Sequence, residues 1–284
     1  MAKPFFKWPG SKSWLINRLT NIWPSDSLRV VEPFAGSAAF YLGSSYSSAF
    51  LADTNQQIIS CLSAVRDKPK KVLEYLSRLQ NNLENYSRVR NENPTSTVAA
   101  AGRLIFLTNT SWGGLYRENL LGKFNVPYGN NGRQFFCEDA ILSASEKLKS
   151  VEIQHCGFAQ TLEKPGKNDL IFVDAPYVTK INSQFFDRYH ATKFGWDDQL
   201  LLAKLLNRKI MGSKKMLITC AADPDLYQLF AHWSVFEFSK RNSMTAHTDK
   251  RGYRTEALLL SPALNEFSRL IEGEGLGTCV KRLL

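Results

Sequence analysis

The sequence predicts an α/β fold built around a mainly parallel sheet. Three short and mostly apolar runs, at residues 28–31, 49–52 and 170–173, are each followed by a carboxylate. The third run, Leu-Ile-Phe-Val, is typical of a strand buried on both faces of a parallel sheet. Segments with helical periodicity lie between and after these runs, which favours alternating strands and helices.

The other elements follow from periodicity and from turn residues. We expect helices at residues 14–22, 58–65, 98–109 and 196–208, and a charged helical segment at 68–90. Further strands are expected at residues 215–220, 235–238 and 256–260, the last two as a hairpin.

Residues 174–177, Asp-Ala-Pro-Tyr, end the run at 170–173. Proline has no N–H to give to a strand ladder, so the chain turns here. Open α/β sheets bind ligands at the carboxyl ends of their strands. A carboxylate that accepts hydrogen bonds and a ring that stacks suit a planar polar ligand. Many strands end in Asp-x-Pro merely to turn, so this stretch alone does not define a site.

Residues 32–37, Glu-Pro-Phe-Ala-Gly-Ser, join the first run to a helix. Small residues let the backbone approach a ligand closely. The stretch has neither G-x-G-x-x-G nor G-K-[ST], which weakens a dinucleotide or nucleoside triphosphate site and makes a nicotinamide-dependent oxidoreductase improbable. Asp53 follows about 20 residues later, where such folds hold ribose hydroxyls.

The composition favours a polyanionic partner. The chain has 284 residues and a formal charge of +10, with a pI near 9.4. Nucleic acid is the commonest partner of so basic a protein. The five cysteines are widely spaced and form no metal-binding pattern, which fits a reducing cytosol. We expect a cytoplasmic protein with no leader, membrane span or metal.

Four motifs in order give a specific resemblance: Lys-Trp-Pro-Gly-Ser-Lys at 7–12, Glu-Pro-Phe-Ala-Gly-Ser at 32–37, Asp-Thr-Asn at 53–55 and Asp-Ala-Pro-Tyr at 174–177. Together they resemble the Dam-type, alpha-class, site-specific DNA N6-adenine methyltransferases. The resemblance extends through residues 194–200 and covers nearly the whole chain. It implies a Rossmann-like S-adenosylmethionine-dependent methyltransferase sheet with an inserted, mainly helical target-recognition domain.

The resemblance also implies a division of the chain and a reaction. Residues 1–66 and 151–284 would form the catalytic, cofactor-binding domain, and residues 67–150 the DNA-binding insert. The enzyme would transfer a methyl group from S-adenosylmethionine to N6 of adenine in a short double-stranded site, by base flipping. Its partners would be double-stranded DNA and, genetically rather than physically, a cognate restriction endonuclease.

Site residues follow from the matched motifs. The catalytic residues would be Asp174, Ala175, Pro176 and Tyr177, with the Asp174 carboxylate and the Ala175 carbonyl accepting hydrogen bonds from the adenine amino group. The cofactor would contact Trp8, Lys12, Phe34, Gly36, Asp53 and Asp174. DNA contacts are expected from Arg117, Asn119, Lys123, Asn125, Pro127 and Tyr128 in a hairpin turning at 121–123, and from Lys250 and Arg251 in a basic loop.

The chain departs from the family pattern at three positions. Ala175 stands where the family usually has proline, which leaves open a catalytically impaired protein that still binds cofactor and DNA. Glu118 stands where an aromatic residue is usual, and Leu121 where a basic residue is common. A carboxylate can accept a hydrogen bond from cytosine N4. GATC is the leading candidate for the target site.

Overall fold

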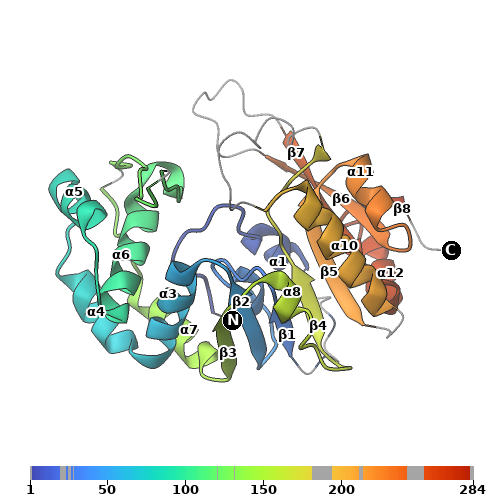
Figure 1. Cartoon of the computed structure of the whole chain (residues 1–284), viewed down its shortest axis with the longest axis horizontal. Coiled ribbons are helices and arrows are strands. Elements are labelled where there is room, and N and C mark those ends of the chain that lie inside the picture. The colour runs from blue at the N-terminus through green and yellow to red at the C-terminus, as the bar shows by residue number, and fades with distance from the viewer. Residues whose placement is uncertain are drawn as a thin grey trace. The chain divides into compact units, whose positions relative to one another are not determined.

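The computed structural model describes residues 2–19, 24, 27, 29–119, 121–130, 132–180, 194–210, 214–241 and 253–281. Its strands are β1 (Val30–Glu32), β2 (Ala49–Asp53), β3 (Val151–His155), β4 (Leu170–Val173), β5 (Lys215–Ala221), β6 (Ser234–Arg241), β7 (Tyr253–Leu260) and β8 (Thr278–Lys281). They form one mixed sheet in the order β3-β2-β1-β4-β5-β7-β6-β8. The predicted α/β class is therefore confirmed (Figure 1).

The helices that precede the β3 strand are α1 (Ser13–Leu19), α2 (Ala39–Gly43), α3 (Gln56–Asp67), α4 (Pro69–Ser77), α5 (Leu83–Asn91), α6 (Thr97–Thr110), the 3-10 turn η1 (Trp112–Gly114) and α7 (Glu138–Leu148). Those that follow it are α8 (Phe158–Thr161), α10 (Trp196–Ile210), α11 (Pro224–Leu229), the 3-10 turn η3 (Pro262–Leu264) and α12 (Asn265–Gly273). None of the described helices has the length and apolar character needed to cross a bilayer.

The chain divides into two compact units, each described here by itself. Unit 1 comprises Met1–Asn17 and Ala35–Cys156, and unit 2 comprises Arg18–Phe34 and Gly157–Leu284. The predicted insert at 67–150 lies within unit 1. Its boundaries differ from those of the compact units, and the predicted domain division remains a prediction.

Unit 1 places a parallel pair of strands beside a group of helices. β2 pairs with β3 from Ala49 opposite Val151 to Asp53 opposite His155. Helix α3 packs against α6 and α7, and α4 packs against α6; Figure 1 shows these helices gathered together. Helix α3 begins after Asn55, whose side chain accepts hydrogen bonds from the first-turn N–H groups and so replaces their missing partners.

Unit 2 holds the centre of the sheet. β1, β4 and β5 are parallel neighbours, while β7 runs antiparallel to both β5 and β6. Every residue of β1 and of β4 is buried, as the uninterrupted apolar run at 170–173 predicts. The predicted hairpin of the two late strands is confirmed by the β6–β7 pairing.

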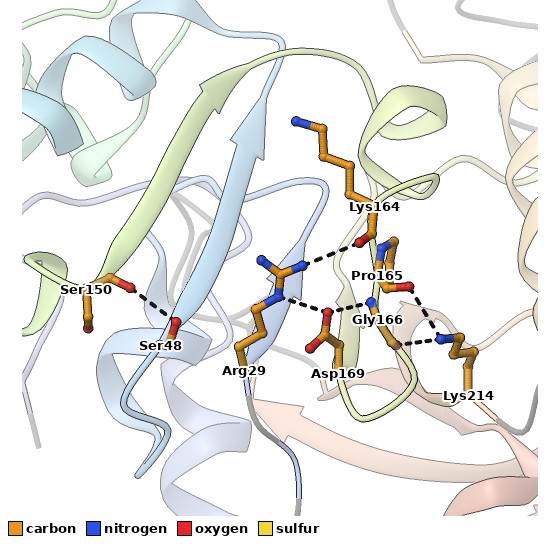
Figure 2. Close-up of polar contacts among 8 residues, drawn as sticks. All are labelled: Arg29, Ser48, Ser150, Lys164, Pro165, Gly166, Asp169 and Lys214. Carbon is orange, nitrogen blue, oxygen red and sulfur yellow. Dashed lines mark hydrogen bonds and ion pairs between the residues drawn. The ribbon is translucent and has the colours of Figure 1, made fainter.

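A partly buried ion pair fixes the amino ends of β1 and β4. Nε of Arg29 donates a 2.9 Å hydrogen bond to Oδ2 of Asp169, which also accepts the backbone N–H of Gly166 at 2.8 Å. Lys214 donates to the carbonyl oxygens of Pro165 and Gly166 (Figure 2). These contacts hold the turn before β4 and set where that strand begins.

Several expected elements differ in extent. The charged segment at 68–90 forms two helices, α4 and α5, because the side chain of Asn82 caps α5 and starts a new helix there. The expected helix at 14–22 is described over Ser13–Leu19. Sequence reasoning had no expectation for β3, α7, α11, α12 or β8.

Candidate active site

In unit 1 the end of β2 is tied to the small-residue turn. Oδ2 of Asp53 accepts the backbone N–H of Gly36 at 3.0 Å, and Oδ1 accepts that of Asn55 at 2.8 Å. Burial raises the pKa of the Asp53 carboxyl above its ordinary value, although these two hydrogen bonds oppose the rise. The carboxylate predicted to bind ribose therefore also orders the loop around it.

The turn at Gly36 requires a residue without a side chain. Its φ is +50°, in the left-handed region, and a Cβ there would lie 3.0 Å from Cδ1 of Trp8. Trp8 packs at a ring-centroid distance of 4.7 Å against Tyr116. Unit 1 thus brings together three of the predicted cofactor residues: Trp8, Gly36 and Asp53.

Lys12, the fourth predicted cofactor residue in unit 1, is only 3% exposed. Its ammonium donates a hydrogen bond to the carbonyl of Gly10, within the Pro-Gly-Ser turn. The lysine therefore stabilises the turn that carries Trp8, and its predicted role toward the cofactor remains a prediction.

In unit 2 Phe34 belongs to a cluster of three partly exposed aromatic rings. It stacks on Phe158 with centroids 5.6 Å apart and an interplanar angle of 22°. Phe194 meets both rings edge-on, at 5.5 Å and 5.8 Å. We did not identify Phe158 as a site residue from the sequence; it begins the short helix α8, for which we had no expectation.

The predicted catalytic tetrapeptide follows β4 directly. Oδ1 of Asp174 accepts a 2.6 Å hydrogen bond from Oγ1 of Thr219, which is only 2% exposed on the neighbouring strand β5. Within the turn the Ala175 side chain is buried, whereas Pro176 is exposed. Thr219 was missed from the sequence, because a single hydroxyl in an apolar strand shows its partner only once the strand pairing is known.

Tyr177 lies beside two carboxylates. Its hydroxyl is 3.3 Å from Oε2 of Glu256 on β7. Burial raises the pKa of the Tyr177 phenol well above its ordinary value, and the charges of Asp174 and Glu256 add to that rise. The phenol therefore stays protonated throughout the neutral range.

The expected hairpin turn is present in unit 1. The Asn119 N–H donates to the Lys123 carbonyl at 2.9 Å, and the Asn125 N–H donates to the Arg117 carbonyl at 3.0 Å. All four of these side chains are exposed, and Pro127 is exposed as well. We call residues 116–128 the recognition hairpin.

Tyr128 and Glu118 of the recognition hairpin make side-chain contacts within unit 1. The Tyr128 hydroxyl donates to the Asn81 carbonyl at 2.8 Å, and its ring packs on Tyr86 at 5.2 Å. Glu118 accepts a 2.9 Å hydrogen bond from Nε2 of Gln57. Both side chains are engaged within the protein, and the DNA-contact role of Tyr128 remains a prediction.

Unit 1 contains a cavity of about 780 Å³. Lys3, Lys7 and Arg133 line it together with Phe135 and Phe136. Its described lining residues include no carboxylate. Lys250 and Arg251 lie outside the described residues. In the described part of the chain, no group of three His, Cys, Asp or Glu side chains could hold a metal.

Known proteins match this chain over most of its length. The sequence pattern of the D12 class N6 adenine-specific DNA methyltransferases matches residues 8–245. The type II methyltransferase M1.LlaDCHI of Lactococcus lactis subsp. cremoris is 25% identical over 268 residues, covering 90% of this chain and 94% of that protein.

Two further relatives come from other organisms. The type II methyltransferase M.MjaIII of Methanocaldococcus jannaschii is 27% identical over 275 residues, covering 88% of this chain and 95% of that protein. The DNA adenine methylase of Haemophilus influenzae is 30% identical over 223 residues, covering 76% and 78%.

The mixed sheet, with β7 reversed between β5 and β6, is consistent with the S-adenosylmethionine-dependent methyltransferase fold. The chain belongs to the D12 class N6 adenine-specific DNA methyltransferases. It is an adenine-specific DNA methyltransferase, and the family resemblance predicted from its motifs is confirmed. Membership in this class implies methyl transfer from S-adenosylmethionine.

Proposed function

We propose that the chain methylates N6 of an adenine in a short double-stranded DNA site after flipping that adenine out of the duplex. The observation that carries the proposal is the hydrogen bond between Thr219 and Asp174 at the carboxyl end of β4. This contact supports a role for Asp174 as a preorganised acceptor, because Thr219 is buried and its hydroxyl oxygen lies only 2.6 Å from Oδ1 of Asp174.

Adenine N6 is a poor nucleophile, since its lone pair is delocalised into the ring. In our proposal the Asp174 carboxylate and the Ala175 carbonyl accept hydrogen bonds from the two amino protons. Positive charge develops on N6 as it attacks, and acceptors fixed in advance stabilise that charge without rearranging. Tyr177 would stack on the base, while its hydroxyl hydrogen-bonds to Glu256.

The residues present fit the cofactor. S-adenosylmethionine supplies an activated methyl group when it is bound. The Asp53 carboxylate would accept hydrogen bonds from its ribose hydroxyls, since each carboxylate oxygen can accept more than one donor. Phe34 and its aromatic neighbours offer flat apolar surface suited to a purine ring.

We propose that the recognition hairpin contacts the DNA through Arg117, Asn119, Lys123, Asn125, Pro127 and Tyr128, with Lys250 and Arg251 contacting phosphates. The exposure of Arg117 and Lys123 supports this role. GATC is the leading candidate for the site, because residues 124–129, Phe-Asn-Val-Pro-Tyr-Gly, resemble the recognition hairpin of the Dam-type enzymes. A cognate restriction endonuclease remains a predicted genetic partner.

Incubation with methyl-labelled S-adenosylmethionine and duplex DNA of mixed sequence tests this function. We expect label on adenine N6, within one short motif identified by sequencing that detects N6-methyladenine. Label on cytosine, or on RNA alone, would contradict the proposal. A motif other than GATC would contradict only the target assignment.

A further inference from the structure

Two protein donors hold one carboxylate oxygen of Glu118. Its backbone pairs with Phe124 across the recognition hairpin. Oε1 accepts a 2.9 Å hydrogen bond from Nε2 of Gln57, and the hydroxyl of Tyr116 donates to the same oxygen. The side chain is partly buried, so both contacts are shielded from competing water.

Gln57 connects this carboxylate to the residues around Asp53. The Gln57 N–H donates to Oδ1 of Asn55 at 2.9 Å, and the Asn55 N–H donates to Oδ1 of Asp53 at 2.8 Å. We call residues 53–55 the cofactor loop. Hydrogen bonds made by the side chains and backbone of Gln57 and Asn55 therefore link Glu118 in the recognition hairpin to the carboxylate of Asp53.

A second, apolar connection runs beside the first. Tyr116 packs on Trp8, which in turn lies against the Cα of Gly36 in the turn bound by Asp53. Two sets of contacts, which share Tyr116 and Asp53, thus join the recognition hairpin to the cofactor loop within unit 1.

We infer that Glu118 is a positioning residue, which fixes the recognition hairpin to the cofactor loop through Gln57 and does not itself read a base. The inference rests on the proposed function, because it assigns the hairpin to DNA recognition. Gln57 and Tyr116 both donate to Oε1, so a swing of the side chain away from them toward a base would break both hydrogen bonds. The hydrogen bonds that link Glu118 to Asp53 also predict that DNA recognition and cofactor binding are coupled.

The test compares Glu118→Ala, Gln57→Leu and the double variant. Gln56→Leu is the matched control, since the Gln56 amide donates to Ser60 within its own helix and not to the recognition hairpin. The first readout is the ratio of kcat/KM for the methylated site to that for sites carrying one changed base pair. We expect each single variant to lower this ratio by about tenfold, and the double variant to be no worse.

The same variants distinguish a Glu118 that positions the hairpin from a Glu118 that contacts a base. If Glu118→Ala relaxes one base pair while Gln57→Leu matches the unmodified protein, Glu118 contacts a base and the inference is overturned. Thermal unfolding of all variants shows whether each of them folds.

A second readout needs no activity. Hydrogen exchange at the hairpin amides of Asn119 and Asn125 should be about tenfold faster in Glu118→Ala and Gln57→Leu than in Gln56→Leu, because the hairpin loses its attachment. Equal exchange in all three variants would overturn the inference. An unmodified protein that methylates no DNA would contradict the proposed function while leaving the exchange comparison valid.

Discussion

Gly36 donates its backbone N–H to Oδ2 of Asp53 across 3.0 Å, so the carboxylate at the end of β2 holds the small-residue turn in place. The two residues are distant in sequence, and each resembles part of the family's cofactor motif. Their contact means that a change at Asp53 acts on the order of the turn as well as on the cofactor binding that we propose for this residue.

Replacing Asp53 by Asn should weaken S-adenosylmethionine binding by roughly 10- to 100-fold, since a hydrogen bond to a charged group contributes about 1.5–3 kcal/mol. Isothermal titration calorimetry measures the affinity. Asp67→Asn is the control, because Asp67 is an exposed partner of Arg66 on the surface. Equal affinities for the Asp53 variant and the unmodified protein would refute the assignment.

Cofactor affinity should depend on pH through the same carboxyl group. The pKa of Asp53 is raised by burial, so the ionised form needed for ribose is lost at a higher pH than for an ordinary aspartate. Affinity should therefore fall as the pH is lowered from about 8 to about 4, and Asp53→Asn should flatten that dependence. Parallel pH profiles of cofactor affinity in the unmodified protein and in Asp53→Asn would contradict this prediction.

Folding stability depends on pH in the opposite direction. The raised pKa of Asp53 contributes to the free energy of unfolding at low pH, and this contribution is lost as the pH rises through the raised pKa.

Thr219→Val should lower kcat by roughly 5- to 10-fold, since it removes a hydrogen bond of about 1 kcal/mol that orients Asp174. KM for the cofactor should change less than kcat. Thr108→Val is a matched control, because that buried hydroxyl donates within its own helix. Steady-state kinetics of the unmodified protein and of the two variants measures kcat and KM. An unchanged kcat for Thr219→Val would show that Thr219 does not orient Asp174 for the reaction.

Ala175→Pro should raise kcat by about 2- to 5-fold, because proline restricts the backbone that aims the Ala175 carbonyl, an effect of about 0.4–1 kcal/mol. Initial methylation rates measure it. A proline variant that is active beside an inactive unmodified protein would support the impaired alternative, whereas equal rates would show that the alanine carbonyl is already well placed.

Asp169→Ala should lower the free energy of unfolding by roughly 1–3 kcal/mol, because it leaves the Arg29 and Gly166 donors without their acceptor. Asp67→Ala should change it by less than about 0.5 kcal/mol. The carboxylates differ in exposure, at 6% for Asp169 and 51% for Asp67. Urea unfolding followed by circular dichroism compares them, and equal losses would contradict the assigned role of the buried pair.

The strands at 49–53 and 170–173 could be predicted because a buried parallel strand is a short apolar run that ends abruptly at a polar residue. β3 escaped prediction for the opposite reason. Its sequence, Val-Glu-Ile-Gln-His, is largely polar and only Val151 is fully buried, as suits a strand at the edge of the sheet.

The candidate site likewise contains residues that the sequence predicts and residues that it does not. Asp53, Asp174 and Gly36 are predictable because each stands in a local motif. Thr219, Phe158 and the partner of Glu118 are not, since their roles depend on contacts across 45, 124 and 61 residues. Contacts of that kind are set by strand pairing and helix packing, which local periodicity does not encode.

In the proposed function the Asp174 carboxylate accepts a hydrogen bond from the adenine amino group during methyl transfer. The most direct test is the single-turnover rate of N6-methyladenine formation in duplex DNA by the unmodified protein and by Asp174→Asn, with cofactor affinity measured alongside. We predict that the rate falls by about 100-fold or more in the variant, while cofactor binding falls far less. An undiminished rate in Asp174→Asn would contradict the account.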